Sequence, residues 1–261
     1  MRIEARSRAL CCALAGLLAT SGIAAASTQT VWVADSNSVL GWVNSTTGVP
    51  TMVGPLGTTL SDLAIDGSGN MWGVGGLGLQ WLYSVNPLTG AATPIGDMGA
   101  PINSLVFASD GTLYGAYNAL VKINTATAAL TLVGGLGFQA SGDIAFNGGA
   151  LYMSAVDPGG FGSDVLVRVN TTTGAGTLIG PFGATNMWGL GTGTDGVLYG
   201  GVGNHIVTIS TLTGAASPLS TWPVFNGSFG GVMGMDIAPV PAPGGLGVLL
   251  LGAAGLRRRR A

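Results

Sequence analysis

Arg168-Val169-Asn170-Thr171-Thr172-Thr173-Gly174 is the clearest copy of a phrase that decides the fold of this chain. In each copy a Val or Ile is followed by Asn or Ser, by two variable residues, and then by Thr and usually Gly. The phrase joins one apolar strand to the next, and its five Asn or Ser positions are separated by 42, 38, 46 and 40 residues. These positions are Asn44, Asn86, Asn124, Asn170 and Ser210. A period near 40 residues with several short strands per unit is the signature of β-propeller blades.

A second phrase recurs between copies of the first: an apolar strand, a tight Asp-Gly or Asn-Gly turn, and a strand that carries an aromatic residue near its start. Asn or Asp followed by Gly tolerates the positive φ of two-residue hairpin turns. The aromatic residues are Trp72, Tyr114, Tyr152 and Tyr199. Because they recur at one structural position, we expect each ring to pack between neighbouring blades. A platform for binding carbohydrate is the alternative interpretation.

The phase of the repeat predicts how the ring closes. Residues 30–35 match the second strand of the unit, whereas residues 235–238 match its first strand. We therefore expect residues 30–54 and 232–239 to share one blade, which leaves no exposed edge at the seam. The sequence thus predicts an all-β, five-bladed β-propeller with terminal strand closure over residues 27–239. Its phrasing resembles secreted propellers of the NHL and related repeat classes, which implies an architecture and not a function.

The chain begins with the layout of a secretory signal peptide. Arg2, Arg6 and Arg8 precede an apolar stretch over residues 9–23, and three alanines, 24–26, precede Ser27. A basic start, an apolar centre and a small-residue end are recognised and cut during export. We expect residues 1–26 to be the signal peptide, with cleavage by signal peptidase after Ala26.

The other end of the chain has three parts: Val240-Pro241-Ala242-Pro243, an apolar run over residues 244–256, and Arg257-Arg258-Arg259-Arg260 before Ala261. The 13 apolar residues, or 17 counted from Val240, lie at or below the roughly 17–25 residues that span a bilayer. Arginines beyond such a segment stay cytoplasmic. Residues 240–261 are therefore expected to pause in the inner membrane as a transient intermediate. An ordinary short tail anchor is the alternative.

This tail resembles the Pro-Glu-Pro C-terminal sorting signal (PEP-CTERM) of Gram-negative bacteria that make extracellular polysaccharide, although Ala242 stands where that family usually has Glu. The resemblance implies recognition and cleavage by a membrane protease, an exosortase. It also implies a secreted or cell-surface location, such as a biofilm matrix.

Without these two segments, the body over residues 27–239 carries only Lys122 and Arg168 against ten aspartates, a net charge of −8. We therefore expect no nucleic-acid partner, because phosphate binding needs a basic surface. Cys11 and Cys12 both lie in the signal segment, so the body has no disulfide and no cysteine-based metal site.

Few residues of the body can carry chemistry. It contains one histidine, His205, for which we expect a turn or surface role, and no Cys or Glu. Most acid–base and nucleophile constellations cannot be assembled from this set. We therefore expect no enzyme activity and name no catalytic residue. Residues 66–70 faintly resemble the start of a calcium loop, but turn chemistry explains them.

One constellation could bind a ligand. The residues expected at the start of the innermost strand of each blade are Asp62, Ser104, Asp143, Trp188 and Asp236. If they ring one mouth of the central channel, their oxygen atoms could hold a polar ligand or a cation such as Ca²⁺, and no other cofactor is expected. The alternative is that each Asp accepts hydrogen bonds from backbone amides.

Three function classes remain open at this point. The first is a non-enzymatic exported protein with a structural or interaction role, for which extracellular polysaccharide is a candidate partner. The second is a lectin-like propeller that binds a ligand through Trp188, Asp157 and Asp164. The third is a polysaccharide-active enzyme that would use Asp62 or Asp143.

Overall fold

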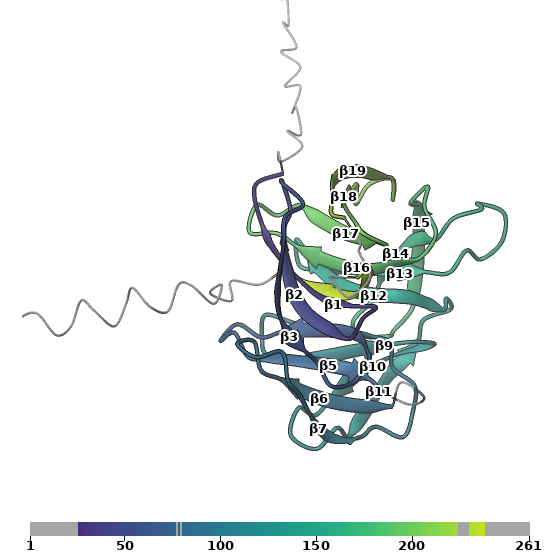
Figure 1. The fold of residues 1–261 in the computed structure, drawn as a ribbon. Coiled ribbons are helices and arrows are strands. Elements are labelled where there is room, and N and C mark those ends of the chain that lie inside the picture. Colours follow the sequence, from purple (N-terminus) through teal and green to yellow (C-terminus); the bar gives the residue numbers. More distant parts are fainter. Residues whose placement is uncertain (1–25, 77, 79, 224–229, 238–261) are drawn as a thin grey trace, which may run out of the picture.

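The computed structural model describes residues 26–76, 78, 80–223 and 230–237 (Figure 1). The elements in these ranges are twenty β-strands, which form five antiparallel sheets of four strands each. The five sheets are the blades of a β-propeller, as the spacing of the Asn-x-x-Thr-Gly phrase predicts. Within each blade, strands that follow one another in the sequence pair by hairpins, because short apolar strands alternate with turns that tolerate positive φ.

The blades are numbered from the one that contains the seam, and their strands are given from the centre outward. Blade 1 contains β20 (Val232–Asp236), β1 (Thr30–Asp35), β2 (Val39–Asn44) and β3 (Pro50–Pro55). Blade 2 contains β4 (Leu60–Ile65), β5 (Met71–Gly75), β6 (Trp81–Val85) and β7 (Ala92–Asp97). Blade 3 contains β8 (Ser104–Phe107), β9 (Leu113–Ala116), β10 (Ala119–Ile123) and β11 (Leu130–Gly135). Blade 4 contains β12 (Ala140–Asn147), β13 (Ala150–Ala155), β14 (Val165–Val169) and β15 (Gly176–Pro181). Blade 5 contains β16 (Met187–Thr192), β17 (Leu198–Val202), β18 (His205–Ile209) and β19 (Ala216–Thr221).

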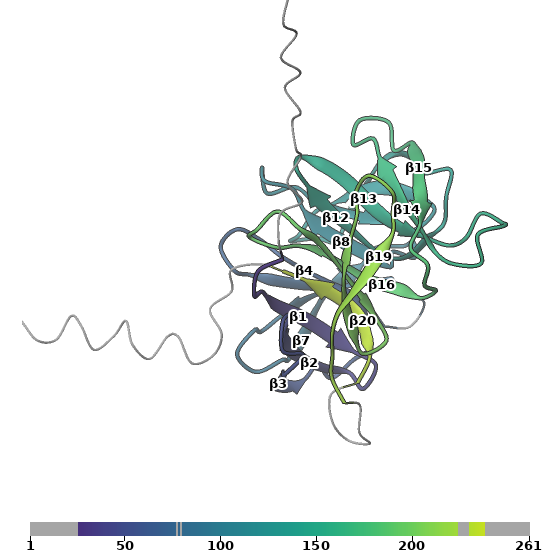
Figure 2. The same cartoon turned by 90° about the horizontal axis from the view of Figure 1, so that it is seen from above.

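The predicted closure between the two ends of the body is confirmed. Strand β20 pairs antiparallel with β1, with Trp32 opposite Asp236 and Val33 opposite Met235, and Figure 2 shows the two strands side by side. A side-chain hydrogen bond also stabilises this pairing, because the buried carboxylate of Asp35, the last residue of β1, accepts from Gly230 N, which precedes β20. The innermost edge of blade 1 is therefore covered by a strand from the far end of the body.

Burial decreases from the centre of the ring to its rim. The innermost strand β4 is buried at five of its six positions, whereas the outermost strand β3 has no fully buried residue. The other outermost strands are likewise partly exposed, and only β15 has a buried residue, Gly180. The core consequently lies between the faces of adjacent blades and around the channel.

The repeated aromatic residues pack between blades, as expected from their position. Trp72 of blade 2 lies against Phe107 of blade 3, with ring centroids 5.0 Å apart, and Tyr114 of blade 3 meets Phe146 of blade 4 at 5.9 Å. Such tilted and edge-on ring pairs are favourable geometries. The seam blade has its own member of this series, because the fully buried Trp32 packs with Leu63 of blade 2.

Glycines allow the blades to approach closely at the rim as well. Gly174, in the turn of the Asn-x-x-Thr-Gly phrase of blade 4, has φ +79° and lies so near Gly134 of blade 3 that a Cβ would meet its backbone. The other close turn contacts at the rim are Gly90 on Gly54, Gly214 on Gly180 and Gly48 on Thr221. In the one copy that lacks Gly, Ala128 adopts φ 61° and faces Gly96.

The two terminal segments that the sequence marks as export signals lie outside the described residues, except for Ala26. This includes Val240 to Pro243 and Arg257 to Arg260. Over the ranges that the structure covers, no helix is long and apolar enough to cross a membrane.

Candidate functional site

The aromatic positions give a common register for the five innermost strands. Ala64, Val106, Ala145, Gly191 and Asp236 lie directly opposite an aromatic residue of the second strand. Relative to this position, Asp62, Ser104 and Asp143 each lie two residues earlier. Trp188 lies three residues earlier, and Asp236 occupies the reference position itself. The five predicted residues therefore occupy three different levels along the channel and do not form one ring.

Asp62 and Asp143 are fully buried, and each joins two blades. Asp62 accepts hydrogen bonds from the amide of its own neighbour Leu63 (2.7 Å) and from Leu105 N of blade 3 (2.5 Å). Asp143 does the same with Ile144 N (2.6 Å) and with Leu190 N of blade 5 (2.5 Å). Both oxygens of each carboxyl group thus accept hydrogen bonds from backbone amides, which is the alternative to ligand binding that the sequence left open. One of the two amides belongs to the neighbouring blade, so the carboxyl group also joins two blades.

Asp236 bridges blades 1 and 2 in the same way, since its side chain accepts from Ile237 N (2.7 Å) and Ile65 N (2.8 Å). Ser104 does not bridge blades. Its hydroxyl donates within blade 3, to Ala116 O, and to the side chain of the adjacent Asn103. Asn103 provides the link between blades 3 and 4 by donating from Nδ2 to Ala140 O (3.2 Å).

Burial controls the protonation of these acids. Burial raises the pKa of Asp62 and of Asp143 well above the ordinary carboxyl value, because the charged form loses its hydration. The two side chains also interact with each other across the channel, and the charge of Asp62 further raises the pKa of Asp143. Burial likewise raises the pKa of Asp236, to about 6. This arrangement favours a proton shared between Asp62 and Asp143 over a cation held by three carboxylates.

The described residues contain no group of three His, Cys, Asp or Glu side chains placed to hold a metal ion. This agrees with the register, because Asp236 lies two positions away from the level of Asp62 and Asp143. The predicted grouping of three carboxylates at one mouth is therefore corrected: two face each other inside the channel, and the third lies farther along it.

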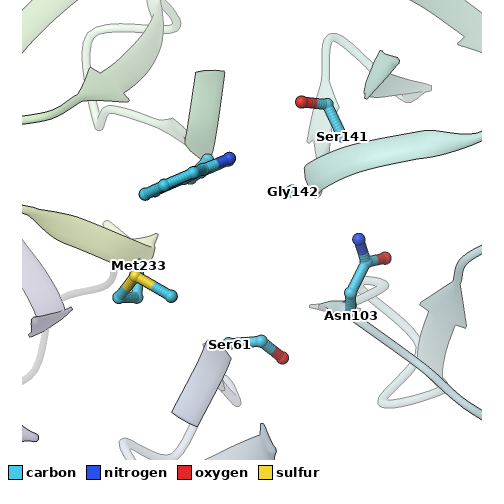
Figure 3. Close-up of a pocket in the computed structure, with 6 residues that line it drawn as sticks. Ser61, Asn103, Ser141, Gly142 and Met233 are labelled. Atoms are coloured by element: carbon cyan, nitrogen blue, oxygen red, sulfur yellow. The ribbon is translucent and has the colours of Figure 1, made fainter. Parts of the chain in front are cut away.

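A cavity of about 180 Å³ occupies the mouth of the channel, at the level of Trp188. All five blades contribute to its wall, and Figure 3 shows the side chains of Ser61, Asn103, Ser141 and Met233 around the open space. The lining residues are Ser61, Asn103, Ser141, Gly142, Trp188 and Met233. None of them carries a charge, so the wall combines one indole, one thioether and three small polar side chains.

The polar groups of this mouth pocket are partly committed to the protein. Ser61 Oγ donates to Val74 O (3.1 Å), and Ser141 Oγ donates to Asp164 Oδ2 (2.5 Å). Both hydroxyl oxygens therefore retain lone pairs that can accept a hydrogen bond. Asn103 Nδ2 has a second N–H after its bond to Ala140 O. The pocket can consequently both donate to and accept from a ligand hydroxyl group.

The other residues that the sequence singled out have local roles. Asp157 accepts hydrogen bonds from three amides of its own loop, at residues 159, 161 and 162. Asp164 accepts from Ser141 and from Met187 N, so it supports the wall of the mouth pocket. His205 is exposed, with Nδ1 2.7 Å from Thr221 Oγ1. The Asp66 carboxylate closes its own turn through Ser68 N and Asn70 N, as turn chemistry predicts.

Sequence reasoning missed Ser61, Asn103, Ser141 and Met233 because small polar residues and a methionine carry no motif. A usable signal was present, because each innermost strand has an apolar residue two positions after the residue that lines the pocket. The residues at that position are Leu63, Leu105, Ile144, Leu190 and Met235. Aligning the strands on them places Ser61, Asn103, Gly142, Trp188 and Met233 at one level.

Comparison with known proteins supports the fold. No protein-family model and no curated protein matches this chain. The chain is similar to a structural genomics protein of unknown function from Bacteroides thetaiotaomicron, at 16% identity and a TM-score of 0.51, over 74% of this chain and 58% of that one. A hydrazine synthase of Kuenenia stuttgartiensis matches at 13% identity and a TM-score of 0.48, over 74% and 65% of the two chains. A PQQ-bound aldose sugar dehydrogenase of Streptomyces coelicolor matches at 15% and 0.46, over 63% and 68%. The chain spans just over half the length of the first of these, and at such identities the likeness concerns the fold alone.

Proposed function

We propose that this chain is a non-enzymatic protein of the cell surface or extracellular matrix of a Gram-negative bacterium. Signal peptidase and an exosortase process its two ends during export, and the five-bladed propeller serves as a structural or interaction module. The tail at residues 240–261, which resembles a PEP-CTERM signal, supports the sorting step. The apolar run and the arginine cluster would hold the chain in the inner membrane only until cleavage.

One observation carries the non-enzymatic part of the proposal. Asp62 and Asp143 are the paired carboxyl groups of the channel, and both are fully buried with two backbone amides each. A catalytic carboxyl group must reach the substrate, or a water beside it, to transfer a proton. These two groups are instead used to hold adjacent blades together.

The processing is tested by intact-mass analysis of the protein recovered outside the cell. We expect a species that starts at Ser27 and ends between Val240 and Pro243. Replacement of Arg257 to Arg260 by Gln should prevent this cleavage, because the arginines that hold the tail in the inner membrane are lost, so the recovered variant should keep residues 244–261. A wild-type extracellular species that still carries residues 249–260 would contradict sorting by an exosortase.

A second candidate, a lectin-like role, is favoured by the mouth pocket alone. A flat indole beside uncharged donors and acceptors suits a neutral hydroxylated ligand, such as one sugar unit of an extracellular polysaccharide. Of the residues that the sequence suggested for this role, Trp188 lines the pocket. Asp164 accepts a hydrogen bond from Ser141, which also lines it.

Glycan-array binding followed by calorimetry tests the lectin-like role. Trp188→Ala should abolish binding of a neutral glycan, because the indole is the largest apolar surface in the pocket. Trp81→Ala is the matched control, since Trp81 is an exposed tryptophan of β6 outside the pocket. Equal binding by both variants, or no binding by the wild type, would remove the lectin-like role and leave the structural role in place.

A further inference from the structure

The residue at which export is expected to leave a new N-terminus is already bound in the structure. Ser27 N lies 2.6 Å from Asp195 Oδ2, and Ser27 Oγ donates to the same oxygen at 3.1 Å. The Tyr199 hydroxyl lies 2.8 Å from Asp195 Oδ2 and 3.1 Å from Ser27 O. One carboxylate oxygen and one phenol therefore contact the amide nitrogen, the hydroxyl group and the carbonyl group of Ser27.

The surroundings of Ser27 are fixed by buried side chains. Gln29 is only 4% exposed, and its Nε2 donates to Ser27 Oγ at 2.6 Å. Gln29 Oε1 accepts from Thr194 N (3.0 Å) and Thr194 Oγ1 (3.1 Å). The backbone of Gln29 is held by the fully buried Ser45, whose Oγ accepts from Gln29 N at 2.8 Å. The segment before β1 is thus held at defined points on blade 5 and on blade 1.

Among the described residues, this contact lies at the one interface between blades where no side-chain hydrogen bond joins the innermost strands. Asp236, Asp62, Asn103 and Asp143 join blades 1–2, 2–3, 3–4 and 4–5 by hydrogen bonds from an innermost-strand or adjacent side chain. No such side-chain bond joins β16 to β20 in the part of the chain that the structure describes. Between blades 5 and 1, the side-chain hydrogen bonds of the described residues involve Ser27 and Gln29, together with Trp222, whose Nε1 donates to Gly230 O before β20.

We propose that Asp195, Tyr199 and Gln29 form a binding site for the α-ammonium group that signal peptidase creates at Ser27. This inference rests on the cleavage after Ala26 in the proposed function. Hydrolysis of the Ala26–Ser27 peptide bond consumes one water and yields a carboxylate on Ala26 and an amino group on Ser27, which takes up a proton at neutral pH. The amide N–H that now donates to Asp195 becomes part of a cation, so a hydrogen bond from a neutral donor to a carboxylate is converted into an ion pair.

Charge supports this assignment. Asp195 and Tyr199 are the titratable groups that contact Ser27, whereas Lys122 and Arg168 belong to β10 and β14 of other blades. Burial raises the pKa of Asp195, but the hydrogen bonds from Ser27 N, Val197 N and the Tyr199 hydroxyl outweigh it and leave the pKa below its ordinary value. The carboxylate is therefore ionised at neutral pH. Burial raises the pKa of Tyr199, so the phenol remains a neutral donor.

The pairing gives the seam a defined pH dependence. A free α-amino group titrates at roughly 7.7–8.0, and the Asp195 carboxylate raises that pKa in the folded protein. The added stability is therefore fully present below the ordinary value, and it is lost as the pH rises through the raised pKa. The precursor, in which Ser27 N is an amide, lacks this dependence.

The test uses the exported mature protein and the fact that Lys122 is the only lysine of the sequence. In a Lys122→Arg background, the α-amino group is the only primary amine, so it can be acetylated selectively, which removes its charge. Reductive methylation of the same group is the matched control, because it keeps the charge. Acetylation should lower the melting temperature at pH 7 by about 2–4 °C, and methylation should lower it less.

The partner residue is tested in the same background. Asp195→Asn should abolish the effect of acetylation and return the α-amino pKa, measured by its rate of modification against pH, to the value of an exposed terminus. Tyr199→Phe is the second variant, since it retains the carboxylate and should keep the raised pKa if Asp195→Asn does not fold. A mature protein that starts elsewhere than Ser27 would overturn the cleavage, whereas a Ser27 terminus with the same α-amino pKa with and without Asp195 would overturn the ion pair alone.

Discussion

The aspartates of the channel and the aspartates of the turns differ in what their hydrogen bonds connect. Asp62 binds an amide 43 residues away in the next blade, whereas Asp66, four residues later, binds amides two and four residues away. Burial raises the pKa of Asp62. Burial also acts to raise the pKa of Asp66, but there the hydrogen bonds from Asn70 and Ser68 together outweigh it and lower the pKa. One residue type thus holds the ring together at the centre and shapes single turns at its surface.

Removal of a channel carboxyl group should have the largest effect. Asp143→Ala leaves Ile144 N and Leu190 N without their acceptor in a buried site, which should lower the free energy of unfolding by about 4 kcal/mol. Urea unfolding measures this change. A loss below about 1 kcal/mol would mean that solvent enters the channel and replaces the carboxyl group.

The pH dependence of Asp236 should be nearly as large. Its pKa of about 6 lies above the ordinary value near 3.8. The protonated side chain therefore stabilises the folded state fully below pH 3.8, and this stabilisation is lost as the pH rises through about 6. The loss amounts to about 3 kcal/mol for a shift of this size. Urea unfolding between pH 4 and 7 should show a decline that is shallower in Asp236→Asn, and parallel profiles would show that Asp236 titrates normally.

The turn aspartate should show the smallest effect, with the opposite pH trend. Asp66→Ala removes bonds within one exposed turn and should cost less than about 1 kcal/mol. Because the pKa of Asp66 is lowered in the folded state, its contribution is present at neutral pH and is lost as the pH falls through that pKa. Urea unfolding at pH 7 and pH 3 checks both statements. A loss as large as that of Asp143→Ala would remove the distinction between channel and turn.

The architecture could be predicted from the sequence because it repeats. The Asn-x-x-Thr-Gly phrase fixes the unit, and the phase of residues 30–35 and 235–238 fixes the closure that pairs Trp32 with Asp236. Five independent copies also average out local irregularities. The number of blades and the seam therefore follow from the spacing alone.

The level of each channel residue could not be predicted in this way, because it depends on a register of single residues. Pairing is irregular near the start of four innermost strands, between Leu60 and Asp62, Ala140 and Ile144, Met187 and Gly189, and Val232 and Gly234. Such irregularities shift which residue faces the channel. Counting from the start of a strand therefore placed Trp188 and Asp236 at the wrong level. The contacts of Ser27 with Asp195 join positions 168 residues apart and have no sequence signature.

The glycine contacts at the rim have a consequence for how many blades the ring can contain. Two adjacent sheets form a wedge, and its angle is set by their separation at the channel and at the rim. At the rim, Gly174 lies against the backbone of Gly134 with no space for a Cβ, and Gly90, Gly214 and Gly48 make similar contacts. Side chains at these positions would widen the wedge, and five wider wedges would exceed a full turn. The glycines at the periphery therefore keep these wedges narrow enough for five of them to fit within one turn.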